Sequence, residues 1–161
     1  MKTLVVYDTQ FGNTEKVARI IAEGLTRCGP VQVLPVAEAA DVELGDVDLL
    51  IVGGPTQGHR ARKPLRDWVD HLRSEELQRL AIAAFDTRIS WPMFLSGSAA
   101  HTIANLLQRH NARLALPPES FIVEESEGPI SQAELDRAAS WAETLAAKVE
   151  ATGRMHTGVS R

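Results

Sequence analysis

Residues 9–14 read Thr9-Gln10-Phe11-Gly12-Asn13-Thr14, and they lie between an apolar run at residues 4–7 and a helical pattern that begins near Thr14. This stretch therefore connects a buried strand to a helix. Its hydroxyl and amide side chains, its glycine and the first N–H groups of the helix can all point at one anion, which the positive end of the helix dipole also attracts. We predict a phosphate site here.

The same stretch lacks the features of two other phosphate-binding loops. It has no lysine after a second glycine, as a P-loop has, and no second or third glycine, as a dinucleotide fingerprint has. Neutral donors without a cation suit a cofactor held by many hydrogen bonds, and they do not suit a nucleotide held through magnesium. The alternative is an ordinary turn and helix cap, which Thr, Gly and Asn also form.

The rest of the chain alternates between strand-length apolar runs and longer segments of helical period. The runs are residues 4–7, 31–36, 47–52 and 80–85, with an interrupted one at 113–123. Between them, apolar residues recur on single helix faces. These faces are Val17, Ile20, Ile21 and Leu25; Ile103, Leu106 and Leu107; and Leu135, Ala138, Ala142, Leu145 and Val149, the last helix opening with the capping box Ser131-x-x-Glu134.

The composition of the runs predicts the order of the strands. Proline interrupts the second run at Pro35 and the fifth at Pro117-Pro118, and proline belongs on edge strands. The first, third and fourth runs are nearly all apolar, as in parallel strands covered on both faces. We predict an α/β fold, a three-layer doubly wound five-stranded parallel sheet of order 2-1-3-4-5, with its crevice at the carboxyl ends of strands one, three and four.

Length and composition bound the class of protein. The 161 residues suit one domain, predicted at 1–151, and residues 152–161 lack apolar periodicity and are predicted to be a mobile tail. The apolar content is ordinary, no run approaches the ~20 residues of a membrane span, and no export signal is present, so we expect the cytoplasm. A net charge of −4 gives no reason to expect nucleic-acid binding. The oligomeric state stays open.

Cysteine and histidine exclude other chemistry. The single Cys28 cannot form an internal disulfide or a redox pair, and we predict a structural thiol. The five histidines have no metal-ligand spacing, so we predict no metal. Any redox chemistry must then come from a cofactor.

Two further segments fall at the predicted crevice. Gly54-Pro55-Thr56-Gln57-Gly58-His59 follows strand three, and Asp86-Thr87-Arg88 follows strand four and leads to Trp91. Together with residues 9–14 they resemble the three FMN-binding loops of the flavodoxin family, over roughly residues 3 to 150 and without the insertion that splits strand five in the long-chain group. The resemblance implies FMN, with its phosphate at residues 9–14 and its ring between the other two loops. The residues implied to bind it are Thr9, Gln10, Phe11, Gly12, Asn13, Thr14, Pro55, Thr56, Gln57, Gly58, His59, Asp86, Thr87, Arg88 and Trp91.

Departures from the family pattern concern the ring. Phe11 stands where flavodoxins usually have Thr, so only its backbone N–H can donate. The loop after strand four lacks the usual glycines. Trp91 is a candidate to stack on the flavin, and the alternative is a Trp buried beneath the loop. His59 either covers the other face of the ring or is a solvated loop residue. Trp68 and Trp141 are expected to serve in packing.

The charges near the crevice also differ from the family. Flavodoxins present acidic residues near the flavin, whereas Arg60, Arg62, Lys63 and Arg66, with Arg88 nearby, predict a basic rim here. Such a rim would attract redox partner proteins with acidic docking patches. The leading hypothesis is an electron-transfer protein that carries single electrons. The alternatives are an FMN-dependent NAD(P)H:quinone oxidoreductase and a flavin-free interaction module on the same fold.

Overall fold

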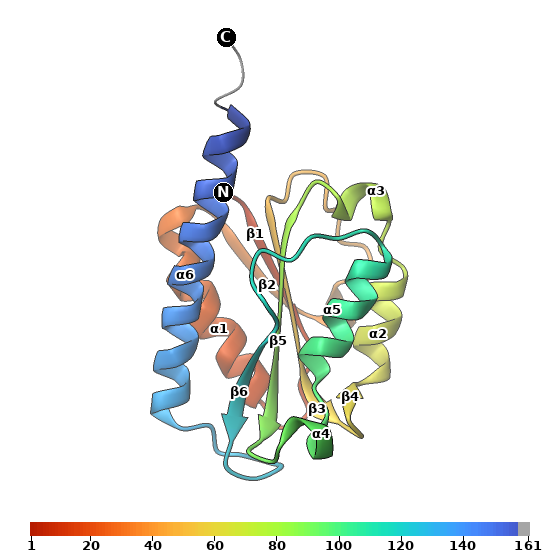
Figure 1. The fold of residues 1–161 in the computed structure, drawn as a ribbon, viewed down its shortest axis with the longest axis vertical. Helices are drawn as coiled ribbons and strands as arrows, with labels where there is room; N and C mark the ends of the chain where they lie inside the picture. The colour runs from red at the N-terminus through yellow and green to blue at the C-terminus, as the bar shows by residue number, and fades with distance from the viewer. Residues whose placement is uncertain (158–161) are drawn as a thin grey trace.

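A parallel sheet forms the centre of the protein, whose computed structural model describes residues 1–157 (Figure 1). The sheet has the order β2-β1-β3-β5-β6, and a short strand, β4, pairs antiparallel with the end of β3. The strands are β1 (Thr3–Tyr7), β2 (Val31–Pro35), β3 (Leu49–Gln57), β4 (Arg60–Ala61), β5 (Ala81–Ile89) and β6 (Glu119–Val123). The helices are α1 (Asn13–Leu25), α2 (Lys63–Asp70), α3 (Ser74–Leu77), α4 (Met93–Ser96), α5 (Ala99–Arg109) and α6 (Gln132–Thr157), with 3-10 turns η1 (Thr26–Cys28) and η2 (Val36–Glu38).

The predicted order 2-1-3-4-5 is confirmed for the five parallel strands, with β2 and β6 at the edges. Two strand ends differ from the prediction, because β3 continues to Gln57 and β5 to Ile89. Pairing of Gly54 with Asp86 and of Pro55 with Thr87 extends the ladder through both segments that we expected to be loops. The fifth run is interrupted as predicted, since Leu114 only bridges Ile82 and β6 begins at Glu119.

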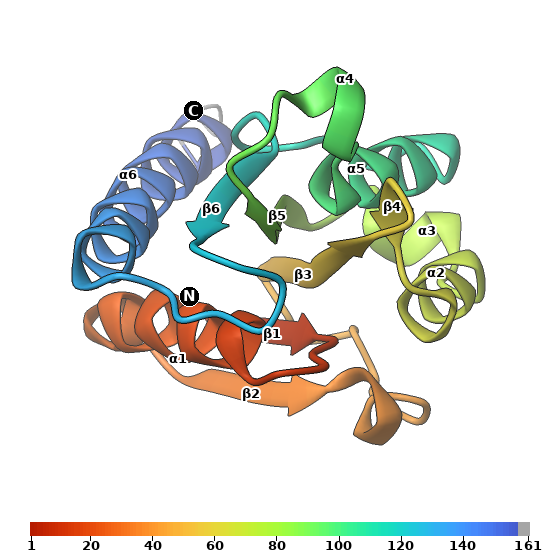
Figure 2. The ribbon, with the colours of Figure 1, turned by 90° about the horizontal axis from the view of Figure 1, so that it is seen from below.

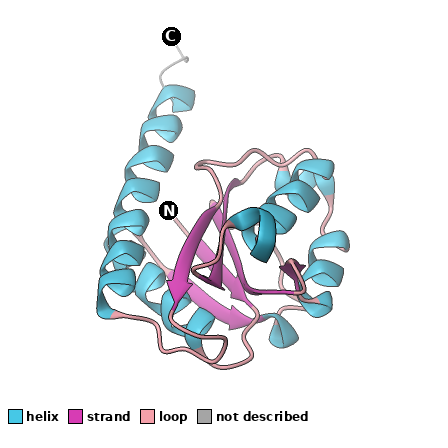
Figure 3. Cartoon of the chain, turned by 60° about the horizontal axis from the view of Figure 1, so that its bottom comes forward, coloured by secondary structure: helices cyan, strands magenta, loops and turns pink. Residues whose placement is uncertain are grey.

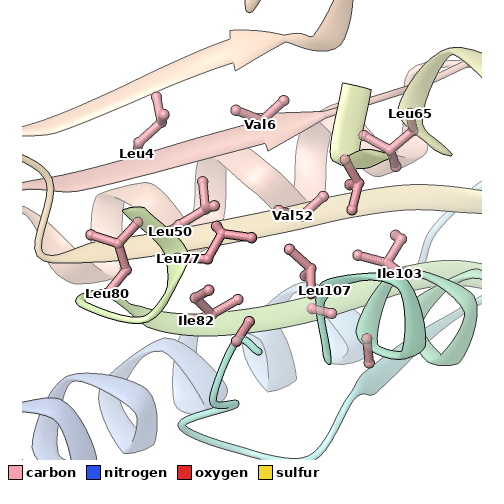
Figure 4. Packing of buried hydrophobic residues seen from close by; sticks show 14 of the residues in the cluster. Leu4, Val6, Leu50, Val52, Leu65, Leu77, Leu80, Ile82, Ile103 and Leu107 are labelled. Carbon is pink, nitrogen blue, oxygen red and sulfur yellow. The ribbon is translucent and has the colours of Figure 1, made fainter. Parts of the chain in front are cut away.

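Helices cover both faces of the sheet in three layers, with α1 and α6 on one face and α2 and α5 on the other (Figures 1 and 3). Alternate residues of a strand point to opposite faces, so each central strand contributes to two cores. Leu50 and Val52 of β3 pack towards α2 and α5, whereas Leu49 and Ile51 pack towards α1 and α6. Figure 4 shows the first of these cores.

The predicted helix faces are confirmed. Val17, Ile21 and Leu25 of α1 are fully buried. The longest helix, α6, packs Trp141 against Phe85 and Phe121, with ring centroids 6.4 and 6.2 Å apart. Trp141 therefore serves in packing, as expected.

The start of α6 has half of the predicted capping box. Ser131 Oγ accepts a hydrogen bond from the Glu134 N–H at 3.3 Å. The Glu134 carboxylate instead accepts from the Ile122 N–H of β6 at 2.6 Å, so it joins the helix to the sheet edge. At its other end, α6 continues to Thr157, and residues 158–161 lie outside the described part of the chain. The boundary at residue 151 and the mobility of the tail stay predictions.

Candidate functional site

A pocket of about 500 Å³ opens at the carboxyl ends of the parallel strands. Figure 2 looks at this end of the molecule, with α4 and β4 on one side and the loop from β6 to α6 on the other. All the residues that we predicted to bind FMN line the pocket, except Gly12 and Asp86. The full lining is Thr9, Gln10, Phe11, Asn13, Thr14, Pro55, Thr56, Gln57, Gly58, His59, Thr87, Arg88, Ile89, Trp91, Leu95, Ser96, Val123 and Ser126.

The phosphate-loop prediction corresponds to the turn from β1 into α1. Gly12 has a φ of 86° at the N-cap of α1, and its N–H donates to Thr9 Oγ1 at 3.0 Å. The first-turn N–H groups of a helix have no intrahelical acceptor, so those of α1 are available to an anion. Thr14 adds a hydroxyl that hydrogen-bonds the Thr87 hydroxyl at 2.8 Å, and both side chains are buried. This set of neutral donors fits a phosphate group.

Side chains of the phosphate loop also join it to distant segments. Asn13 Nδ2 donates to the Glu127 carbonyl at 3.0 Å, which holds the loop between β6 and α6 beside the pocket. The Gln57 amide donates to Gln10 Oε1, which links the phosphate loop to the end of β3. Three segments that are far apart in sequence therefore enclose one pocket.

The end of β3 turns back as a β-hairpin. Gln57 pairs with Arg60 across a two-residue turn, and the two turn residues, Gly58 and His59, have φ values of 54° and 70°. Positive φ at both central residues is the geometry of a type I′ turn, which matches the twist of the strands but is unfavourable for histidine. Both turn residues are exposed and line the pocket.

Asp86 lies behind the pocket wall. Its side chain is fully buried, and its Oδ2 accepts hydrogen bonds from Thr56 Oγ1 at 3.1 Å, Ser98 Oγ at 2.5 Å and the Ala100 N–H at 2.9 Å. Ser98 is also the N-cap of α5, accepting from the His101 N–H. Asp86 therefore holds the pocket residue Thr56 against the start of α5.

Apolar side chains crowd the rim on the side of α4. Trp91 is 60% exposed and lines the pocket, so the alternative of a Trp buried beneath the loop is wrong. Phe94 is 85% exposed, and Met93 and Leu95 are exposed as well. Exposed apolar clusters are found at interaction surfaces and beside ligand-binding grooves.

The prediction of a basic rim is wrong for two of its five cations, because a carboxylate compensates each of their charges. Arg62 pairs with Asp8 at 3.2 Å and also donates to the Thr9 carbonyl, so it closes the base of the phosphate loop. Lys63 pairs with Asp67 one helical turn away, at 2.5 Å. Burial raises the pKa of Asp8, and the Arg62 guanidinium acts in the opposite direction.

The loop between β6 and α6 adds negative charge that the sequence analysis did not consider. It carries Glu124, Glu125 and Glu127, all exposed, around the pocket residue Ser126. The rim is therefore basic only on the side of β4. The lining residues that sequence reasoning missed are Ile89, Leu95, Ser96, Val123 and Ser126, and neither a motif nor a spacing marks them.

The flavodoxin family model matches residues 5–117. The chain belongs to the flavodoxin family. Members of this family bind FMN, and the size of the pocket, its apolar rim and the donors at the start of α1 fit that group.

Individual relatives agree with the family. A flavodoxin from Clostridium saccharobutylicum is 32% identical over 89 residues, which are 54% of this chain and 56% of that protein. The chain therefore spans about half the length of this curated relative. The oxidised flavodoxin 2 from Bacillus cereus shares the fold with a TM-score of 0.75 and 21% identity, over 92% of this chain and 99% of that chain. The flavodiiron protein from Giardia intestinalis shares the fold with a TM-score of 0.76 and 15% identity, over 93% of this chain and 36% of that chain.

Within residues 1–157, no helix is long and apolar enough to cross a membrane. No group of three or more His, Cys, Asp and Glu residues in that part of the chain could hold a metal ion.

Proposed function

We propose that the protein binds FMN in the pocket at the strand ends and carries single electrons between redox partner proteins in the cytoplasm. The observation that carries the proposal is that the turn into α1, the hairpin after β3 and the segment after β5 enclose one pocket in a member of the flavodoxin family. Bound FMN supplies the electron-carrying chemistry, and the protein sets its potential through hydrogen bonds, stacking and charge.

The residues divide between the two ends of the cofactor. The N–H groups at the start of α1 and the Thr14 hydroxyl would hold the phosphate. Trp91, exposed at the rim, would stack on one face of the ring, and His59 at the hairpin turn would cover the other. Asp86 would act through Thr56 rather than by contact with the cofactor.

The hairpin turn offers a peptide that can change direction. Rotating the peptide between Gly58 and His59 converts a type I′ turn into type II′, in which only the first residue keeps a positive φ. His59 would then leave an unfavourable conformation, and the Gly58 carbonyl could accept a hydrogen bond from a ligand N–H in the pocket. We expect Gly58→Val to lower the yield of one-electron-reduced flavin. An unchanged yield would contradict this role for the turn.

Partner proteins would dock on the α4 and β4 side of the rim, through acidic patches that surround an apolar contact. Arg60 is exposed and forms no ion pair with a described carboxylate. Helix α4, whose apolar side chains are exposed, lies beside this hairpin (Figure 2), where His59 bridges Gly97. Reoxidation of the reduced protein by ferricyanide should slow as salt is added, and reoxidation by hexaamminecobalt(III) should not. The reverse pattern would assign the opposite charge to the docking surface.

Anaerobic reduction of the FMN-loaded protein tests the proposal. A carrier of single electrons should accumulate one-electron-reduced flavin and should not oxidise NAD(P)H by itself. Rapid NAD(P)H oxidation with a quinone would instead favour the oxidoreductase, for which the apolar rim offers a quinone site. Failure to bind FMN would favour the flavin-free interaction module.

A further inference from the structure

Arg88 is the only residue with a fixed charge among the described residues that line the pocket. The four cations between residues 60 and 66, which are Arg60, Arg62, Lys63 and Arg66, lie outside the lining, and two of them are paired with carboxylates. The carboxylates of Asp8 and Asp86 also lie outside it. Among the lining side chains, a fixed charge therefore comes from Arg88 alone, whereas the charges of Glu124, Glu125 and Glu127 lie at the rim.

The guanidinium of Arg88 is bound by neutral oxygens. Its Nη1 donates to the Trp91 carbonyl at 2.7 Å, and to the Ile89 carbonyl and Ser96 Oγ at 3.4 Å. It forms no ion pair with any carboxylate of residues 1–157, and its Nε is buried without a hydrogen-bond acceptor. The side chain thus anchors the segment from Trp91 to Ser96 while its positive charge remains uncompensated.

A half-buried cation acts strongly on charge that appears beside it. The effective dielectric constant near a protein surface is about a quarter of that of water, so the same pair of charges interacts several times more strongly there. A neutral ligand has little favourable electrostatic interaction with such a cation, whereas the same ligand in an anionic form has much more. A pocket with this wall therefore favours the anionic form.

We propose that Arg88 holds reduced FMN as the anion that lacks the N1 proton, and so raises the two-electron midpoint potential of this pocket. The inference rests on the proposed binding of FMN. Oxidised FMN takes up two electrons and one proton to give this anion, and a second proton, at N1, gives the neutral reduced form. The electrons come from the titrating reductant, which is dithionite in the experiment below.

The test uses variants that separate charge from anchoring. Arg88→Gln removes the charge and keeps an amide donor, Arg88→Lys keeps the charge, and Arg79→Gln removes an exposed cation from the opposite end of the sheet, just before β5. Each FMN-loaded protein is titrated with dithionite against a reference dye at several pH values. We expect Arg88→Gln to stabilise the anion about tenfold less, which lowers the two-electron midpoint by about 30 mV. Arg88→Lys and Arg79→Gln should shift it by less than half as much.

The outcomes separate this inference from the proposed function. If the absorbance spectrum shows only free FMN before any reduction, both the proposed function and the inference about Arg88 are contradicted. Bound FMN with the same midpoint in Arg88→Gln and wild type would overturn the inference alone, and so would an equal shift in Arg88→Lys. Arg88→Met gives a second test if Arg88→Gln fails to fold, because it also removes the charge and keeps an unbranched apolar side chain. Its two-electron midpoint should likewise fall by about 30 mV, a tenfold effect, and an unchanged midpoint would overturn the inference.

Discussion

Replacing Gly97 by alanine should detach the α4 segment from the hairpin turn. Gly97 has a φ of 70°, and a Cβ added there would lie 2.1 Å from the His59 carbonyl oxygen and 2.4 Å from the His59 Cα. Both neighbours are backbone atoms, so no side chain can rotate away to relieve the overlap. The two segments must separate if the variant folds.

The magnitude follows from two separate penalties. Gly97 combines its φ of 70° with a ψ of −172°, a region essentially restricted to glycine, and such a conformation costs other residues about 1–3 kcal/mol. Forcing an extra carbon into a packed contact typically costs about 1–3 kcal/mol. Their sum, about 2–6 kcal/mol, should lower the Tm of a chain of this size by roughly 10 °C. Because Trp91, Leu95 and Ser96 line the pocket, FMN affinity should also fall, by at least about tenfold.

Two control variants isolate the penalties. Gly58 has a φ of 54°, and nothing lies within 4 Å of a Cβ added there. Gly58→Ala should therefore lower the free energy of unfolding only by the strain of a left-handed backbone conformation, about 1–2 kcal/mol. Gly45→Ala has open space and no positive φ, so its free energy of unfolding should match the wild type. Urea unfolding followed by circular dichroism, without FMN, measures all three. If Gly97→Ala were as stable as Gly58→Ala, the close contact between Gly97 and His59 would be refuted.

Three further predictions concern the site, the core and pH. Thr14→Val should weaken FMN binding by about ten- to a hundredfold, because one hydrogen bond to a charged group is worth about 1.5–3 kcal/mol, and it should leave riboflavin binding unchanged. Equal losses in calorimetric titrations would remove Thr14 from the phosphate site. Trp141→Ala should lower the free energy of unfolding by about 3–5 kcal/mol, since Trp141 is 8% exposed between Phe85 and Phe121; a loss below about 1 kcal/mol would contradict the packing. Burial alone would raise the pKa of Glu134, but hydrogen bonds from Arg137 and the Ile122 N–H outweigh it and lower the pKa. The stability advantage of wild type over Glu134→Gln should therefore be full above pH 4.5, the ordinary pKa of glutamate, and disappear at lower pH; an advantage that grows in acid would refute it.

The sequence predicts the parallel sheet because its signals are local. Apolar runs, helix faces and the prolines of the edge strands all lie within single elements, and they agree with one another. The ends of β3 and β5 escape this reasoning, because Gly54-Pro55 and Asp86-Thr87 have the composition of loops. The ladder between them and the hydrogen bonds of the buried Asp86 extend the strands in spite of that composition.

The site is predictable where a motif marks it and not where distant contacts form it. The turn into α1 carries its own phosphate-binding pattern. By contrast, Asp8 lies 54 residues from Arg62, and Asn13 lies 114 residues from the Glu127 carbonyl that it binds. The first contact neutralises a predicted rim cation, and the second brings Ser126 to the pocket. Neither partner can be identified from residue type or spacing.

The central claim is that this pocket binds FMN through its phosphate at residues 9–14. Calorimetric titration of the purified protein with FMN and with riboflavin, under the same buffer and salt, tests it most directly. Several hydrogen bonds to a phosphate predict that FMN binds at least about a hundredfold more tightly than riboflavin. Equal affinities would contradict a phosphate site at the start of α1, and no binding of either would contradict a flavin site altogether.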